Sequence, residues 1–257
     1  MPIRYRRMKM KGVILAGGTG KRLFPLTKVL NKHLLPIYDR PMIFYPLELM
    51  AKAGIDEVLL VTGGQNASDF ERLLGDGSDF GLKSLQYAYQ PQAGGVAQAL
   101  GLAEEFAAGS PVCLILGDTL LEFSVHPAAE HYRQQGGGAR ILLKQVDDPS
   151  HFGVAIVDEP SGHVTRIIEK PTEPFPSNLA VIGVYFYDEH VFEIVRGLKP
   201  SSRGELEITD VNNAYIARGT MKADRISGYW ADAGEDIDAY LQACNTVARL
   251  GANKDLP

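Results

Sequence analysis

The feature that most constrains this chain is a repeated alternation of short apolar runs with helical patterns. Runs at residues 12–16, 57–62 and 112–116 are rich in Val, Ile and Leu, and a glycine follows each of them. Continuous apolar runs of this length are typical of strands buried on both faces of a parallel sheet. Helical patterns over 41–53 and 96–108 lie between them, and each is closed by a glycine. The alternation predicts a doubly wound α/β sheet with right-handed crossovers.

The second half of the chain predicts more strands and fewer helices. Strand patterns cover residues 141–146, 153–157, 164–169 and 179–187, and helical patterns cover 207–218 and 236–250. We expect these strands to extend the sheet and to form a β-rich lobe. Residues 1–9 fit no pattern, which predicts a flexible N-terminal tail.

The composition of the chain excludes several classes of protein. The chain has 257 residues, 45% of them apolar, with 26 Lys+Arg against 31 Asp+Glu. These values exclude a disordered or fibrous chain, and the net charge of −5 gives no global reason to bind nucleic acid or an anionic membrane. No apolar run approaches the ~20 residues of a membrane-spanning helix. Cys113 and Cys244 form neither a disulfide framework nor a metal knuckle, which predicts a reduced, cytoplasmic protein.

The sharpest local motif is a glycine loop, LAGGTGKRL at residues 15–23, directly after the first apolar run. Gly17, Gly18 and Gly20 allow backbone N–H groups to approach a phosphate closely. The loop is not a Walker A motif, because Lys-Arg follows Gly20. It is not a dinucleotide fingerprint either, because residue 23 is Leu. On the glycines alone, a tight turn after a buried strand is an equal alternative.

Charged and amide side chains near the ends of the apolar runs point to a phosphate ligand. Arg22 ends the glycine loop and Lys32 follows ten residues later, and two cations can neutralise a triphosphate. Asp118 ends the third run and Asp232 lies near the C-terminus, and carboxylates of this kind can hold Mg²⁺ over phosphates, although a lone aspartate after a strand is more often a turn or a helix cap. Gln90 follows an alternating strand pattern, and its side-chain amide suits the edge of a pyrimidine, although a glutamine on its own is more often a surface residue.

Motifs spread over residues 10 to 250 make the chain resemble the sugar-1-phosphate nucleotidyltransferases. They occur in the order of that family: GVILAGGTGKRLFP (12–25), NKHLLPIYD (31–39), QPQAGGVAQALG (90–101), LGD (116–118), FGV (152–154), IEKP (168–171), residues 180–188, SRGELEITD (202–210) and WADAG (230–234). The resemblance implies a three-layer, Rossmann-like mixed sheet with a β-rich sugar-binding lobe. It also implies one domain over 10–250, with a nucleotide-binding half over about 10–120, a sugar-binding half over about 121–250 and a C-terminal tail over 251–257.

The resemblance further implies an activity. Glucose 1-phosphate would condense with dTTP to give dTDP-glucose and pyrophosphate, with Mg²⁺ as cofactor, in the synthesis of deoxysugar or polysaccharide precursors. The implied catalytic cations are Arg22, Lys32 and Lys170. The implied nucleotide-binding residues are Leu15, Gly17, Gly18, Gly20, Gln90, Gly95 and Asp118. The implied sugar-binding residues are Gly153, Glu169, Lys170, Val181 and Arg203, and the implied metal ligands are Asp118 and Asp232.

Four departures from the family pattern leave sugar choice and rate open. Lys21 stands where Thr or Ser is usual, Thr119 where Asn is usual, Ile182 where Thr is common and Glu235 where Thr is usual. UTP in place of dTTP and another sugar 1-phosphate are alternatives, since one methyl group on the base discriminates weakly. A non-catalytic sugar-nucleotide sensor on the same fold is a second alternative, whereas a dehydrogenase lacks the required glycine spacing. The resemblance implies a homo-oligomer, at least a dimer.

Overall fold

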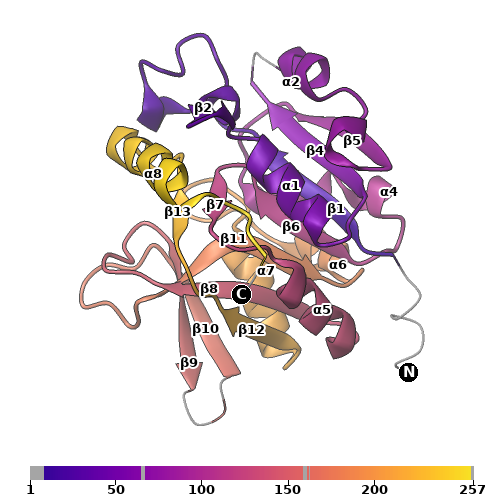
Figure 1. Cartoon of the computed structure of the whole chain (residues 1–257). Helices are drawn as coiled ribbons and strands as arrows, with labels where there is room; N and C mark the ends of the chain where they lie inside the picture. The colour runs from indigo at the N-terminus through magenta and orange to yellow at the C-terminus, as the bar shows by residue number, and fades with distance from the viewer. Residues whose placement is uncertain (1–8, 65–66, 159–160, 162, 256–257) are drawn as a thin grey trace. The chain divides into compact units, whose positions relative to one another are not determined.

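The computed structural model describes residues 9–64, 67–158, 161 and 163–255 (Figure 1). The predicted N-terminal tail therefore lies outside the described residues except for Lys9. The chain divides into two compact units that interleave along the sequence. Gly94–Cys113 and Ala128–Ser227 form most of unit 1, whereas unit 2 contains Met10–Ala93, Leu114–Pro127 and the chain from Gly228 onward.

A parallel sheet forms the centre of unit 2. β1 (Lys11–Ala16) and β5 (Ser84–Gln90) flank β4 (Glu57–Gly63), and all three run in the same direction. β6 (Val112–Leu116) coincides with the third predicted run. The N–H of Gly117, just beyond this strand, donates to the Leu15 carbonyl at 2.8 Å. The three predicted apolar strands are confirmed. Since parallel strands end at one edge of a sheet, the glycine loop and Gln90 reach the same edge.

A small apolar cluster anchors the remaining elements of unit 2. It contains Ile37, Met42, Tyr45, Leu120, Ala233, Ala243 and Val247. The elements around it are β2 (Pro36–Ile37), β3 (Arg40–Pro41), α1 (Phe44–Lys52), β7 (Thr119–Leu121), β13 (Trp230–Asp232) and α8 (Ile237–Leu250). The helix predicted over 41–53 starts only at Phe44, because the chain before it pairs β3 with β2. α8 begins after Asp236, whose side chain accepts a hydrogen bond from the Ala239 N–H at 2.7 Å, as an N-cap should.

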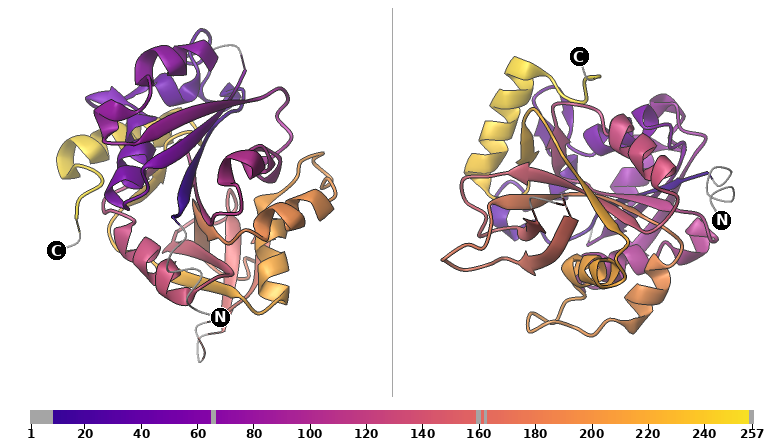
Figure 2. Two further views of the ribbon diagram at one scale, coloured as in Figure 1. Left: turned by 90° about the vertical axis from the view of Figure 1, so that its right-hand side faces the viewer. Right: turned by 90° about the horizontal axis from the view of Figure 1, so that it is seen from below.

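Unit 1 is built on strands that are mostly antiparallel (Figure 2). β9 (Gly153–Asp158) pairs with β10 (His163–Glu169) and β11 (Leu179–Tyr187), β11 pairs with β8 (Ala139–Gln145), and β12 (Met221–Arg225) runs parallel to β8. α7 (Ile208–Ala217) lies against β10 and β12. The predicted β-rich part of the second half is confirmed, and β11 is buried along its whole length.

One predicted helix is wrong in its extent. The pattern over 96–108 is interrupted, and it gives α3 (Val96–Gly101) and α4 (Glu104–Ala107). The N–H groups of Leu102 and Ala103 donate three residues back, to Ala99 and Leu100, which tightens the chain and ends α3.

The other elements carried no separate prediction. They are α2 (Ala67–Leu74), α5 (His126–Gln135), α6 (Val191–Gly197) and the 3₁₀ turns η2 (Lys21–Leu23), η3 (Lys32–Leu34) and η4 (Ser78–Phe80). Within the described ranges, every helix is too short or too polar to cross a membrane.

Candidate active site

The glycine loop closes the end of β1 in unit 2. Gly18 and Gly20 have φ angles of 95° and 60°, which favour glycine, and the Thr27 hydroxyl donates to the Gly20 carbonyl at 2.7 Å. A Cβ on Gly18 would meet nothing within 4 Å, whereas one on Gly17 would lie 3.2 Å from Oε1 of Gln90. The loop and the Gln90 amide therefore lie together, as their predicted nucleotide-binding roles require.

A hydrogen-bonded turn places Lys32 beside this loop. Asn31 accepts a hydrogen bond from the His33 N–H at 3.0 Å and donates from Nδ2 to the Ala16 carbonyl at 3.2 Å. The His33 ring is buried, and a Cβ on Gly117 would lie only 2.7 Å from its Cδ2. The turn that carries Lys32 is thus fixed to the end of β1 and to the residue after β6. Sequence reasoning gave neither Asn31 nor His33 a role.

His33 is neutral at physiological pH. Burial, followed by the charge of Lys32, lowers the pKa of His33 to about 3. The neutral ring of His33 therefore adds no second positive charge next to Lys32.

A pair of three-residue strands brings the two predicted metal ligands together. β7 and β13 are antiparallel, with Thr119 opposite Asp232. The Ala233 N–H donates to the Asp118 carbonyl at 3.0 Å, and the Gly234 N–H donates to Oδ1 of Asp232 at 2.9 Å. The two aspartates therefore occupy adjoining positions on neighbouring strand ends.

Lys32 lies beside these two aspartates. Its ammonium forms an ion pair with the Asp118 carboxylate. Burial lowers the pKa of Lys32, the charges of Asp118 and Asp232 raise it, and the net shift is upward. Burial, followed by the charge of Asp118, raises the pKa of Asp232. A Cβ on Gly234 would lie 2.5 Å from Lys32 Nζ and 2.6 Å from Asp118 Oδ2, so only glycine leaves room for this contact.

The donor set of this cluster fits Mg²⁺. Two carboxylates from adjoining strand ends supply hard oxygen ligands, and Mg²⁺ commonly takes one or two carboxylates with water and phosphate. Across the described ranges no group of three or more His, Cys, Asp and Glu side chains could form an all-protein cage. Arg22 is exposed, and its charge opposes the rise in the pKa of Asp232, so it acts at the same place.

The predicted sugar-binding residues belong to unit 1. The last residue of β10, Glu169, stands opposite Gly153 of β9. Oε2 of Glu169 accepts a hydrogen bond from the Thr209 hydroxyl at 2.6 Å, and Oε1 accepts one from Arg203 at 3.5 Å. A Cβ on Gly153 would lie 3.2 Å from Oγ1 of Thr209 and 3.4 Å from Oε2 of Glu169. Thr209 was not predicted, although it lies within the SRGELEITD motif.

For the other predicted site residues, the structure shows mainly how the backbone is placed. The Lys170 backbone has a φ of 43°, which is uncommon for a side chain other than glycine and sets its direction after β10. Gly95 approaches the Leu206 backbone, where a Cβ would lie 2.4 Å from the carbonyl oxygen. The side chains of Val181 and Leu15 are buried, so either residue would reach a ligand through its backbone.

The four departures from the family pattern differ in burial. Thr119 and Ile182 are buried in β7 and β11, whereas Lys21 is exposed at the start of η2. The Glu235 N–H donates to the Asp232 carbonyl at 3.3 Å, so this acidic residue adjoins the metal ligands.

Comparisons with known proteins show the family of this chain. A family model described as Nucleotidyl transferase matches residues 11–249. A glucose-1-phosphate thymidylyltransferase from Actinoplanes sp. is 46% identical over 232 residues, which cover 89% of this chain and 75% of that protein. A structure of a Bacillus anthracis glucose-1-phosphate thymidylyltransferase with sucrose has a TM-score of 0.86 and 46% identity, covering 93% of this chain and 95% of that one. A UDP-glucose pyrophosphorylase with UDP-glucose has a TM-score of 0.82 and 27% identity, covering 94% and 99%. The chain therefore belongs to the nucleotidyl transferase family.

Proposed function

We propose that this chain is a glucose-1-phosphate thymidylyltransferase that converts glucose 1-phosphate and dTTP to dTDP-glucose and pyrophosphate. A phosphate oxygen of the sugar attacks the α-phosphorus of dTTP, the bond from that phosphorus to the bridging oxygen breaks, and pyrophosphate leaves. The curated relatives with this name, at 40–46% identity over most of the chain, support the proposal.

The observation that carries the proposal is the cluster of Lys32, Asp118 and Asp232 in unit 2. The sugar phosphate is already an anion at neutral pH, so the reaction needs charge compensation and alignment rather than a general base. Asp118 and Asp232 would hold Mg²⁺, which supplies Lewis-acid activation of the phosphates when bound. Lys32 and Arg22 offset the charge of the triphosphate.

The glycine loop and Gln90 recognise the rest of the nucleotide. The N–H groups of Gly17, Gly18 and Gly20 bind phosphate oxygens. The buried Gln90 amide binds the polar edge of the pyrimidine. Thymine differs from uracil by one methyl group, worth about 1–3 kcal/mol, so UTP is the competing nucleotide.

The hydrogen-bonded group around Glu169 in unit 1 supports a sugar site. We assign Glu169 to sugar hydroxyls, with Gly153 and the Val181 backbone beside it. Lys170 and Arg203 are assigned to the sugar phosphate, since both are cations next to Glu169 in sequence or in space. Among these residues Lys170 also stabilises the negative charge that develops during transfer.

A pyrophosphate-release assay tests the proposed activity. The assay combines each of dTTP, UTP and ATP with each of the 1-phosphates of glucose, galactose and mannose. Every combination is measured with and without Mg²⁺. We expect turnover to be highest with dTTP and glucose 1-phosphate and to require the metal. Asp118→Asn and Asp232→Asn should abolish it without lowering the melting temperature. Sugar-nucleotide binding without turnover in every combination would favour the sensor alternative and refute the proposal.

The proposal also includes the localisation of the enzyme and the association of its copies. Cys113 and Cys244 are both free thiols, which supports a reducing, cytoplasmic environment. We also propose that copies of the chain associate, at least as a dimer.

A further inference from the structure

Unit 1 contains a polar hollow of about 590 Å³ that the proposed reaction does not use. Its walls come from α5, from β8 and β12, and from the start of β10. The described part of its lining carries four basic side chains and one carboxylate: His131, Arg140, His163, Lys222 and Asp224. This composition is typical of a site for an anion.

Two of these cations stand side by side across a pair of strands. β12 runs parallel to β8, and Lys222 is the register partner of Arg140. Neighbouring strands lie about 4.8 Å apart, and like charges that face each other across them are destabilising. A negatively charged ligand that touches both side chains would remove this repulsion.

The guanidinium of Arg140 is held in a fixed orientation. The side chain is 12% exposed, its Nε donates to Oε1 of Gln135 at 3.1 Å, and its Nη1 forms an ion pair with Asp224. The Gln135 amide is fixed in turn, because its Nε2 donates to the carbonyls of Gly137 and Ala139 at 2.9 and 3.1 Å. A preorganised guanidinium loses little conformational entropy when its remaining N–H groups bind a phosphate.

The carboxylate of Asp224 does not neutralise Lys222. Asp224 is shared between Arg140 and Nδ1 of His131, which lies 3.3 Å from its Oδ2. The Lys222 ammonium instead donates to Nε2 of His163 at 3.3 Å, and among the described residues it has no acidic partner. The described side chains of the hollow therefore leave a positive charge unbalanced.

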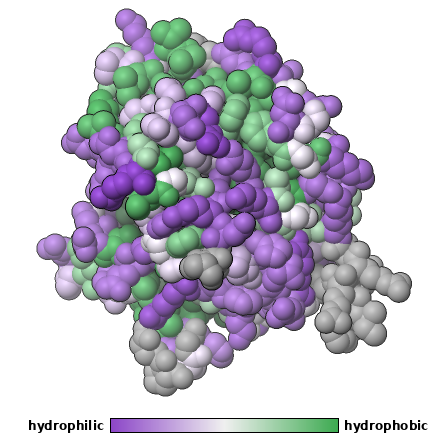
Figure 3. Space-filling view, viewed as in Figure 1, coloured by the Kyte–Doolittle hydropathy of each residue, from purple (hydrophilic) through white to green (hydrophobic). Residues whose placement is uncertain are grey.

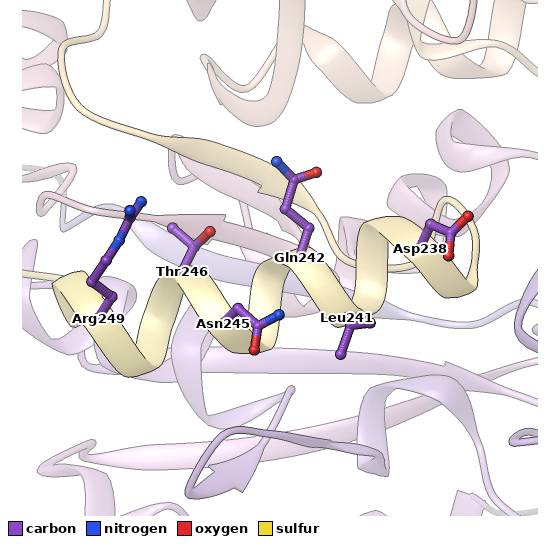
Figure 4. A pocket seen from close by; sticks show the side chains of 6 residues that line it. All are labelled: Asp238, Leu241, Gln242, Asn245, Thr246 and Arg249. Atoms are coloured by element: carbon purple, nitrogen blue, oxygen red, sulfur yellow. The ribbon is translucent and has the colours of Figure 1, made fainter.

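A second polar hollow, on α8 in unit 2, lacks this surplus of positive charge. Figure 4 shows one acidic and one basic side chain at its two ends, Asp238 and Arg249, with neutral side chains between them. Its described charges balance, so it offers an anion no net attraction. In unit 1, Figure 3 shows mainly hydrophilic surface over α5, which forms one wall of the basic hollow.

The size and polarity of the basic hollow restrict the class of its ligand. A volume of about 590 Å³ lies in the range of small-molecule sites and exceeds the room that one phosphate ion needs. Among the described residues of the lining, Ala223 is the only apolar one, and Gln134 adds an exposed side-chain amide. The rest of the ligand is therefore hydrophilic, as in a sugar or a polyol, rather than a base or an aliphatic chain.

We propose that this hollow binds a hydrophilic phosphate monoester, with Arg140 and Lys222 on the phosphate and the two histidines beside them. His163 begins β10 and Glu169 ends it, about 20 Å further along the strand, so the hollow is not the proposed sugar site. It shares no residue with the proposed nucleotide, sugar and metal sites. The inference therefore goes beyond the proposed function and does not depend on it.

Amide NMR titrations of the full chain test the proposal, because each amide signal reports its own surroundings. The probes are glucose 6-phosphate, inorganic phosphate and glucose. We expect glucose 6-phosphate to shift the signals of β12 and of the Gln135 side chain. Inorganic phosphate should shift the same signals at higher concentration, and glucose should not. Tighter binding of inorganic phosphate than of the ester would overturn the assigned ligand class, and unshifted β12 signals would overturn the site.

Lys222→Met should weaken the binding of glucose 6-phosphate by about tenfold or more, because it removes one of the two phosphate ligands. Arg140→Lys keeps the charge but loses the planar fork, and it should weaken binding by about fivefold. The amide signals of the remaining strands show whether each variant keeps the fold.

Lys199→Met is the matched control. Lys199 is an exposed lysine of unit 1 that does not line the hollow, so its replacement removes the same charge from the same unit. It should leave binding unchanged. Wild-type affinity in Lys222→Met, or an equal loss in Lys199→Met, would overturn the proposal. None of these titrations uses turnover, so failure of this proposal and failure of the proposed reaction are read separately.

Discussion

The ammonium of Lys32 pairs with the carboxylate of Asp118, although the two residues are 86 positions apart in the chain. The turn at Asn31 fixes the first residue, and the pairing of β7 with β13 fixes the second beside Asp232. In the free protein the lysine therefore supplies the positive charge that compensates two partly buried carboxylates. A divalent cation that binds these carboxylates must compete with it.

Lys32→Met separates the two consequences of that competition. The rate of pyrophosphate release should fall by about 100-fold or more, because a preorganised cation on the phosphates is lost. The affinity of the free protein for Mn²⁺ should rise by roughly tenfold, because two carboxylates lose their internal counter-charge. Electron paramagnetic resonance of free Mn²⁺, measured without substrates, reports the second effect.

Asp118→Asn is the matched control for the metal measurement. It removes one charge of the acidic pair and should weaken Mn²⁺ binding. If Lys32→Met weakened Mn²⁺ binding as well, Lys32 would not compete with the cation, and its contact with Asp118 would have another role.

Gly234→Ala tests how tightly the cluster is built. The new Cβ would lie within 2.6 Å of both Lys32 Nζ and Asp118 Oδ2, so the ion pair must shift. We expect turnover to fall about tenfold or more, since small displacements of aligned groups are costly in catalysis. The melting temperature should change little, because the lysine is the end of a flexible side chain.

Gly197→Ala is the control substitution, because a Cβ at this position meets nothing within 4 Å. It should leave turnover unchanged. Equal activity of the two variants would show that the cluster tolerates the added methyl group.

The sheet could be predicted from the sequence because its strands are long and uniformly apolar. The runs at 12–16, 57–62 and 112–116 each fill one buried strand, so local pattern and burial agree. The break between α3 and α4 could not be predicted, because 96–108 keeps an apolar helical pattern through Leu102 and Ala103.

The site was predictable only in part. Charge and motif membership identify four candidate site residues from the sequence: Arg22, Lys32, Asp118 and Asp232. The convergence of Asp118 and Asp232 depends on β7 and β13, which are three residues long and too short to show periodicity. The buried His33 ring packs against Gly117, and the hydroxyl of Thr209 donates to Glu169. These neighbours are distant in sequence, and no local pattern identifies them.

Thr209→Val tests the proposed sugar site. The variant removes the hydroxyl that donates to Oε2 of Glu169 at 2.6 Å, so this carboxylate loses the contact that orients it. The KM for glucose 1-phosphate should rise about tenfold, since hydrogen bonds to charged groups contribute about 1.5–3 kcal/mol. The KM for dTTP should stay constant.

Thr209→Ser keeps the hydroxyl and should restore most of the sugar affinity. Steady-state kinetics with each substrate varied in turn distinguishes the outcomes. An equal rise of both KM values would instead indicate a general structural defect.

His33→Gln tests the effect of a buried neutral imidazole on stability. Burial and Lys32 lower the pKa of His33 to about 3, whereas an unfolded histidine titrates near 6.5. Below pH 6.5 the unfolded chain binds a proton that the folded chain excludes, so acid favours unfolding. Between pH 7.5 and 5 this one residue should lower the free energy of unfolding by about 2 kcal/mol. Glutamine does not titrate, so the variant should lose about 2 kcal/mol less than the wild type over the same range. Urea unfolding at each pH measures both curves, and other titrating groups cancel in their difference. Parallel curves for the two proteins would mean that the His33 ring accepts a proton in the folded state.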